Sequence, residues 1–219
     1  MAVSKELSPF TPGRPVPPEL FVGRTDQIEK VSCAARQVRQ GRQENLFITG
    51  EYGIGKSSLA SVTCYLAERE YGLVGFHVFL AGAQNVQAAI AHIADRIAQR
   101  AYRESRLAPL KSLFAKYVRQ VELFGVQIDF QAIRQELAGA TANLVPFLRS
   151  VWKRLRPRWK GITLVLDDLN GITSDPRFPR LLKSTVDEIA TSRSPLPLLL
   201  MLAGVHERRN EMIQHQPLT

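Results

Sequence analysis

Short apolar runs alternate with amphipathic segments along most of the chain. Continuous apolar runs of strand length predict strands at residues 45–49, 73–80, 162–166 and 198–203. Apolar positions spaced three or four residues apart predict helices at 26–40, 56–71, 84–119, 141–156, 180–191 and from 206 onward. Strands that alternate with helices indicate an α/β fold. We therefore predict a three-layer αβα sandwich around a mostly parallel sheet.

Two segments depart from this alternation. Between residues 121 and 130, apolar and polar residues alternate around Gly125, which predicts a β-hairpin. The hairpin is either an inserted contact element for a partner or a cap on the sheet. Residues 1–20 are rich in Pro, Ser and Thr and have no periodicity, so they predict an extended arm before a core at 21–219.

Composition limits the cell compartments in which the protein can work and the partners that it can bind. At 219 residues with 45% hydrophobic residues, the chain can bury the core of one domain. Its longest apolar run, residues 196–205, is too short to cross a bilayer, and no signal peptide precedes the arm. Cys33 and Cys64 lack metal-type spacing and are predicted to be small core residues in a reducing compartment. We expect a cytoplasmic protein without a membrane partner.

One motif carries most of the chemistry. The pattern Gly50-x-x-x-x-Gly55-Lys56-Ser57 matches the P-loop (Walker A) in full, and it lies between a predicted strand and a predicted helix. Glycines with positive φ let backbone N–H groups surround phosphates at a helix N-terminus, Lys56 neutralises the terminal phosphates, and Ser57 is a ligand for Mg²⁺. The predicted nucleotide-binding residues are Gly50, Glu51, Tyr52, Gly53, Ile54, Gly55, Lys56, Ser57 and Ser58.

Two acids end the third predicted strand. Asp167 and Asp168 follow the apolar run 162–166, at the strand end where α/β sheets bind ligands. We expect Asp167 to hold Mg²⁺ through water and Asp168 to lie where a base orients the attacking water. Residues 84–156 lie between the two motifs and are predicted to be a helical and β-hairpin insertion.

These motifs resemble those of the AAA+ and STAND ATPases, particularly the bacterial and archaeal branch similar to origin-recognition ATPases. Residues 18–24 resemble the N-terminal box of that family, which implies that Phe21 and Val22 line the adenine. The P-loop at 48–59 and the strands at 164–168 and 198–203 look like its Walker A, Walker B and sensor-1 segments. The likeness spans about residues 18–216.

The chain departs from the family pattern in three places. The family norm after the Walker B strand is Asp-Glu, whereas Asp167-Asp168 stands here, as in many STAND proteins, which implies slow hydrolysis. At the sensor-1 position only His206 offers a polar group. The family's fifth strand, arginine finger and helical lid have no residues left before Thr219, so we expect the lid to be absent and the ATPase activity of this chain alone to be weak or absent.

A second surface is open to two interpretations. The net charge of +9 favours a polyanionic partner, either nucleic acid or anionic lipid. Six basic residues with no acid among them interleave with Trp152 and Trp159, a composition that suits nucleic acid: Arg149, Lys153, Arg154, Arg156, Arg158 and Lys160. The alternative is that these residues form the solvated side of an amphipathic helix whose tryptophan is core.

The predicted function is an ATP-dependent switch. ATP and Mg²⁺ are the expected cofactors, and Lys56 and Asp168 are the expected catalytic residues. We expect the switch to act through self-association or through a protein partner. The chain has no guanine-reading Asn-Lys-x-Asp or Thr-Lys-x-Asp motif, so GTP is not expected. The alternatives are a DNA-linked loader or transposition-helper ATPase, and a nucleotide-binding architectural module without turnover.

Overall fold

The fold was taken from a computed structural model, which describes residues 18–115, 118–122, 125–128, 144–169 and 171–215. The strands are β1 (Gln43–Thr49), β2 (Leu73–Phe79), β3 (Val118–Glu122), β4 (Gly125–Ile128), β5 (Gly161–Asp167) and β6 (Leu198–Gly204). The α-helices are α1 (Thr25–Arg39), α2 (Lys56–Leu66), α3 (Val86–Arg103), α4 (Lys111–Phe114), α6 (Leu144–Leu155), α7 (Arg177–Thr191) and α8 (His206–His215). Shorter turns of helix are η2 (Pro18–Leu20), η3 (Ala67–Tyr71), η4 (Ser105–Leu110) and η6 (Ile172–Ser174).

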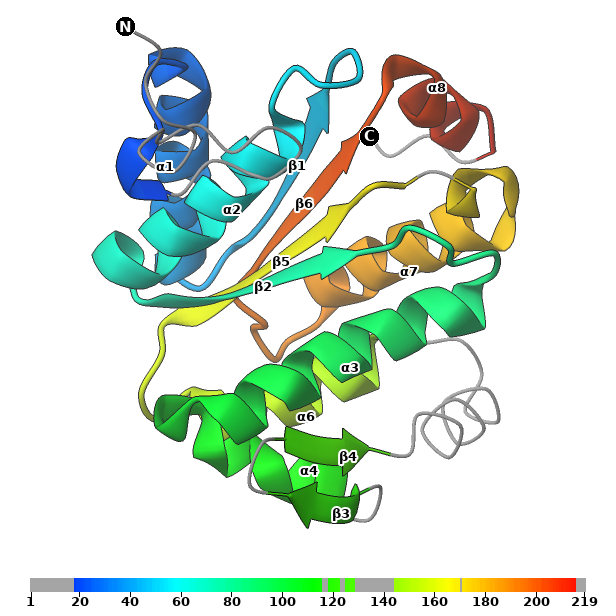
Figure 1. The fold of residues 1–219 in the computed structure, drawn as a ribbon. Coiled ribbons are helices and arrows are strands. Elements are labelled where there is room, and N and C mark those ends of the chain that lie inside the picture. The colour runs from blue at the N-terminus through cyan, green and yellow to red at the C-terminus, as the bar shows by residue number, and fades with distance from the viewer. Residues whose placement is uncertain (1–17, 116–117, 123–124, 129–143, 170, 216–219) are drawn as a thin grey trace, which may run out of the picture.

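Four parallel strands form the central sheet in the order β1-β6-β5-β2. Every residue of β5 and β6 is buried, as expected for parallel strands covered on both faces. The described strands confirm the predicted α/β fold. Because all four run the same way, the loops after β1, β5 and β6 leave the sheet at one end (Figure 1).

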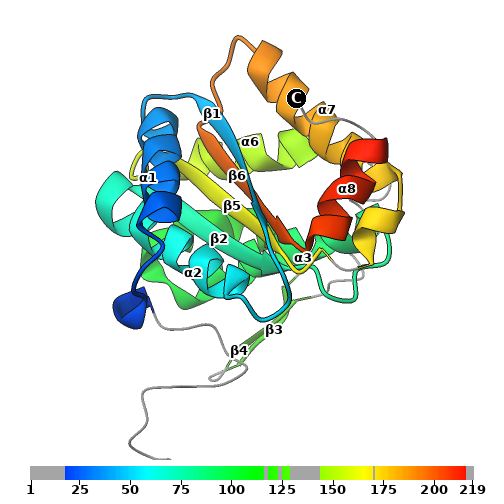
Figure 2. The same cartoon turned by 90° about the horizontal axis from the view of Figure 1, so that it is seen from above.

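Helices cover both faces of the sheet. Helices α1 and α2 lie on one face, and α3, α6 and α7 lie on the other (Figures 1 and 2). The larger core belongs to the second face, where Phe76, Leu164 and Leu200 pack with residues of α3, α6 and α7. A smaller cluster on the first face joins Val31 and Ala60 to Val165 and Met201. The strand side chains therefore alternate between two helical layers.

The segment predicted as one helix at 84–119 is broken in the structure. Helix α3 begins at Val86, where the side chain of Asn85 accepts a hydrogen bond from Ala88 N at 2.9 Å. It ends at Arg103 because Glu104 is extended, and the 3₁₀ turn that follows contains Pro109. The prediction is wrong at its C-terminal end, where Val118 already belongs to β3.

The remaining predictions fall on smaller elements. Strands β3 and β4 pair antiparallel, which confirms the hairpin; it lies beyond α3 and α4 from the sheet (Figure 1). The part of the predicted arm at 1–17 and the helix start at 141–143 lie outside the described residues. Cys33 is exposed and not a core residue, because it faces away from the sheet side of α1. Within the described part of the chain, no helix combines the length and apolarity needed to cross a bilayer.

Candidate functional site

The P-loop connects β1 to α2, as its position between a strand and a helix predicted. Gly53 and Gly55 have φ of 79° and 92°, in the left-handed region that a side chain disfavours. Gly50, in contrast, does not have positive φ. The constraint at Gly50 is one of space: a Cβ there would lie 2.9 Å from Cγ2 of Ile54, so that side chain would have to shift. The loop therefore depends on its glycines for two different reasons.

Lys56, the first residue of α2, folds back over the loop. Its Nζ donates hydrogen bonds to the carbonyl oxygens of Gly50 at 3.0 Å and Glu51 at 2.7 Å. The guanidinium of Arg24 donates to the carbonyl oxygen of Ile54. Both cations thus hold carbonyl groups of the loop, and both lie where negative phosphate oxygens would attract them.

The predicted nucleotide-binding side chains differ in exposure. Tyr52 is 94% exposed and Val22 is 87% exposed, whereas Phe21 is half-buried. Ile54 is also an exposed apolar residue, and Glu51 is exposed beside it. Among the described residues, the loop and the N-terminal box therefore offer an open apolar surface next to the phosphate cradle, of the kind that marks a binding site. Ser58, in contrast, is buried in α2.

Asp167, at the end of β5, is the best-fixed acid of the site. It is 2% exposed, and its Oδ1 accepts a hydrogen bond from Asp168 N at 2.8 Å. Its Oδ2 also accepts a hydrogen bond from His77 Nε2 at 2.9 Å, and the Ser57 side chain lies near the carboxylate. Burial alone would raise the pKa of Asp167, but the hydrogen bonds from His77 and Ser57 outweigh it and hold this pKa below its ordinary value.

Ser57 and Asp167, the two predicted Mg²⁺ ligands, lie near each other where α2 meets the end of β5. A hydroxyl and an ionised carboxylate are hard oxygen donors, which suit Mg²⁺. The residues present therefore fit that ion.

His77 is a site residue that the sequence prediction missed. In β2, Val74, Phe76 and Val78 face the core beneath α3, so the intervening His77 faces α2. Its ring lies 4.5 Å from the ring of Phe79, at an interplanar angle of 32°. Because strand side chains alternate, the sequence of 73–80 places His77 on the face opposite Val74, Phe76 and Val78. The sequence does not show that the P-loop helix covers this face or that β2 adjoins β5.

Asp168, the predicted base, has φ of 55°, a value that is uncommon for a residue other than glycine. Such conformations concentrate at functional sites. The residue is half-buried and follows Asp167 directly at the end of β5.

The end of β6 offers little polar chemistry. Ala203 and Gly204 close the strand, Val205 follows, and His206, the predicted sensor-1 residue, is exposed at the start of α8. Helix α8 packs back on the loop after β5, where Thr173 Oγ1 donates to Glu211 Oε2 at 2.6 Å.

The six basic residues do not act as one free surface. Arg149 donates to the carbonyl of Ser194 at 2.9 Å, and Arg154 donates to Ser112 Oγ at 2.9 Å. The other four are exposed: Lys153, Arg156, Arg158 and Lys160. Trp152 and Trp159 are half-buried against the core, and the Arg106 guanidinium covers the Trp159 ring at 5.4 Å. The tryptophans therefore support the fold, while the four exposed cations remain available to solvent.

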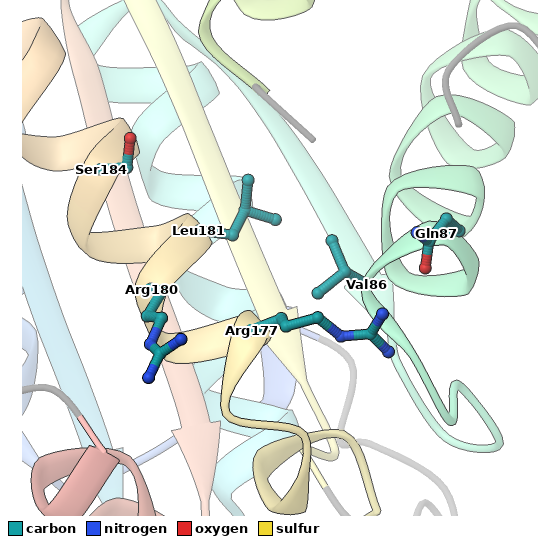
Figure 3. Close-up of a pocket in the computed structure, with 6 residues that line it drawn as sticks. All are labelled: Val86, Gln87, Arg177, Arg180, Leu181 and Ser184. Carbon is teal, nitrogen blue, oxygen red and sulfur yellow. The ribbon is translucent and has the colours of Figure 1, made fainter. Parts of the chain in front are cut away.

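A shallow pocket of about 300 Å³ lies elsewhere, between α3 and α7 (Figure 3). Arg177 reaches from α7 toward Val86 on α3, and it is paired with Asp175 at 2.9 Å. No residue of the P-loop lines this pocket, so the candidate nucleotide site is defined by the loop and by Asp167.

Comparison with known proteins agrees with this geometry. The chain matches the family described as "AAA ATPase domain" over residues 20–209. No curated protein sequence matches it. Its fold is similar to the Aeropyrum pernix ORC2 protein solved in ADPNP–ADP complexes, with a TM-score of 0.55 and 18% identity. That match covers 91% of this chain but 45% of the other chain.

The family match covers most of the chain, and the structural match shares the parallel sheet and flanking helices described above. The chain therefore belongs to the AAA ATPase domain family, as a nucleotide-binding P-loop ATPase domain whose fold resembles that of origin-recognition ATPases.

Proposed function

We propose that the chain binds Mg²⁺–ATP at the P-loop and acts as a nucleotide-dependent switch of STAND type with slow hydrolysis. The observation that carries this proposal is the proximity of Ser57 to the Asp167 carboxylate, which brings the predicted Mg²⁺ ligands together beside Lys56. Bound Mg²⁺ would neutralise charge on the β- and γ-phosphates.

The chain's own residues would do the rest of the binding. The Lys56 ammonium would exchange the carbonyl oxygens of Gly50 and Glu51 for phosphate oxygens, and the N–H groups of residues 50–57 would surround the phosphates. Phe21 and Val22 would line the base, next to Tyr52. Ser57 and Asp167 would hold the metal ion.

Slow turnover is supported by what surrounds Asp168. As the base, it would accept a proton from the attacking water, and its side chain is one methylene shorter than the Glu of the family norm. Ala203, Gly204 and Val205 offer no side-chain polar group at the end of β6. Such a site would keep ATP bound for a long time before hydrolysing it. A long-lived bound state suits control of assembly or of a protein partner.

The test is nucleotide binding by calorimetry together with phosphate release by the same chain. We expect Mg²⁺-dependent ATP binding with little release, and we expect Asp168→Asn to keep the binding while lowering any release further. ATP affinity that cannot be detected, with or without Mg²⁺, would reject the proposal. Release by Asp168→Asn at the parent rate would reject Asp168 as the base.

The second candidate is a DNA-linked loader or transposition-helper ATPase, and the four exposed cations after and along α6 favour it. Lys153, Arg156, Arg158 and Lys160 lie at the end of the sheet opposite the P-loop, because β5 starts at Gly161 and ends at Asp167. DNA that stimulates turnover with a steep salt dependence would support this candidate. ATP binding with no turnover under any condition would instead indicate an architectural module.

A further inference from the structure

We propose that His77 is a positioning residue for the metal side of the nucleotide site: its Nε2–H fixes one oxygen of Asp167, so that the carboxylate meets Ser57 and Mg²⁺ in a single orientation. This inference rests on the proposed binding of Mg²⁺–ATP. It concerns β2, a strand that contains none of the predicted site residues.

The hydrogen bonds of Asp167 divide between its two oxygens. Oδ2 lies 2.9 Å from His77 Nε2, and Oδ1 accepts from Asp168 N at 2.8 Å. The side chains of His77 and Asp167 are 10% and 3% exposed, so water has little access to compete for this contact. Since a carboxylate only accepts hydrogen bonds, the ring nitrogen that faces it carries the hydrogen.

The imidazole is itself held in place. Phe79 packs against one side of the ring, at 4.5 Å between centroids. Two residues before His77, Gly75 N donates to Glu68 Oε1 at 3.0 Å and the Gly75 carbonyl accepts from Arg100. A Cβ on Gly75 would lie 2.8 Å from Cβ of Cys64, so β2 packs directly on α2. The packing of β2 on α2 and of Phe79 on the ring therefore fixes the position of the His77 Nε2–H donor.

The sheet order explains why this support comes from β2. Asp167 ends β5, which lies between β6 and β2. On the β6 side, residues 203–205 carry no polar side chain, whereas on the β2 side His77 reaches the carboxylate. Partners that orient a metal ligand typically change metal affinity by about 10–100-fold when they are removed. We expect the loss of His77 to change the affinity for Mg²⁺ by that factor and to leave the affinity for the nucleotide without Mg²⁺ unchanged.

The experiment compares nucleotide affinity of the 219-residue chain in Mg²⁺ and in EDTA, for the parent, His77→Leu and His77→Gln. Gln is the matched control, because its amide N–H can replace the Nε2–H donor. We expect His77→Leu to lose about tenfold of the affinity gained from Mg²⁺ while its affinity in EDTA stays that of the parent. His77→Gln should keep most of the gain, and the melting temperature of each variant reports folding.

Each other outcome overturns the inference. A parent-like gain from Mg²⁺ in His77→Leu would mean that His77 only packs. Equal losses in Mg²⁺ and in EDTA would assign it a purely structural role, and a His77→Gln variant that behaves like His77→Leu would exclude the hydrogen bond as the cause. If the parent itself gains nothing from Mg²⁺, the proposed Mg²⁺–ATP site fails together with the role of His77.

Discussion

The candidate nucleotide site has two sides, and they differ in how firmly the protein holds them. On one side, Asp167 is 2% exposed and accepts hydrogen bonds from His77 of β2 and from Asp168 N at the end of β5. On the other side, the P-loop exposes Tyr52 at 94%, and among the described residues Lys56 donates its hydrogen bonds to carbonyl groups of the loop itself.

This difference indicates a division of roles. On the Asp167 side, hydrogen bonds from His77 and from Asp168 N already fix the carboxylate, which would reduce the ordering cost of binding a metal ion. On the P-loop side, Lys56 and Arg24 would first have to give up their hydrogen bonds to loop carbonyl groups if they are to contact phosphate. Nucleotide binding should therefore change the loop more than the end of β5, and the two sides should respond differently to substitution.

The largest expected effect is on the P-loop side. Lys56→Ala removes the ammonium that would neutralise the terminal phosphates, and hydrogen bonds to charged groups contribute about 1.5–3 kcal/mol each. ATP affinity measured by calorimetry should fall by roughly 100-fold or more, beyond detection. Lys30→Ala, on the exposed side of α1, is the control and should bind as the parent does. Parent-like affinity in Lys56→Ala would remove the P-loop from the binding site.

The next effect tests what holds β2. Arg100 and Glu68 are 12% and 14% exposed and pair at 2.6 Å over Gly75. Arg100→Met keeps the aliphatic stem but leaves Glu68 and the Gly75 carbonyl without this donor, which should cost about 3 kcal/mol in the free energy of unfolding. Chemical denaturation measures it, with Arg103→Met, an exposed arginine of the same helix, as the control. An equal, small change in both variants would show that the pair does not stabilise β2.

A smaller effect is expected from Asp167, the proposed metal ligand. Asp167→Ala should remove the gain in ATP affinity from Mg²⁺, about 10–100-fold, while affinity in EDTA stays close to the parent value. Titrations with and without Mg²⁺ separate the two. If the variant still gains affinity from Mg²⁺, the ion is held elsewhere, and the fixed side of the site has another purpose.

Much of this site could be predicted from the sequence, because its main signals are local. The P-loop pattern needs only the spacing of Gly50, Gly55 and Lys56, and the run 162–166 indicates a buried strand that ends in acids. His77 could not be predicted, because its contact with Asp167 depends on β2 lying beside β5 in the sheet.

The pairing of Arg100 with Glu68 is likewise tertiary. The break after Arg103 was missed because the apolar period continues into the 3₁₀ turn, where Leu107 and Leu110 are also buried.

The smallest effect concerns pH and the acids behind β2. A hydrogen bond from Arg100 lowers the pKa of Glu104 below its ordinary value, and Arg106 and Glu68 complete the cluster. Because the pKa is lower in the folded state, Glu104 stabilises the fold above its unfolded pKa of about 4.3. That stabilisation is lost as pH falls through the lower folded value. The melting temperature of Glu104→Gln should therefore lie below that of the parent at neutral pH, and the two should converge in acid, where the parent carboxyl is protonated.

Glu70→Gln, at an exposed acid on η3, controls for loss of charge and should follow the parent at every pH. A constant offset between Glu104→Gln and the parent across the pH range would mean that the amide disturbs packing, and that ionised Glu104 adds nothing to the support of Arg100 and β2.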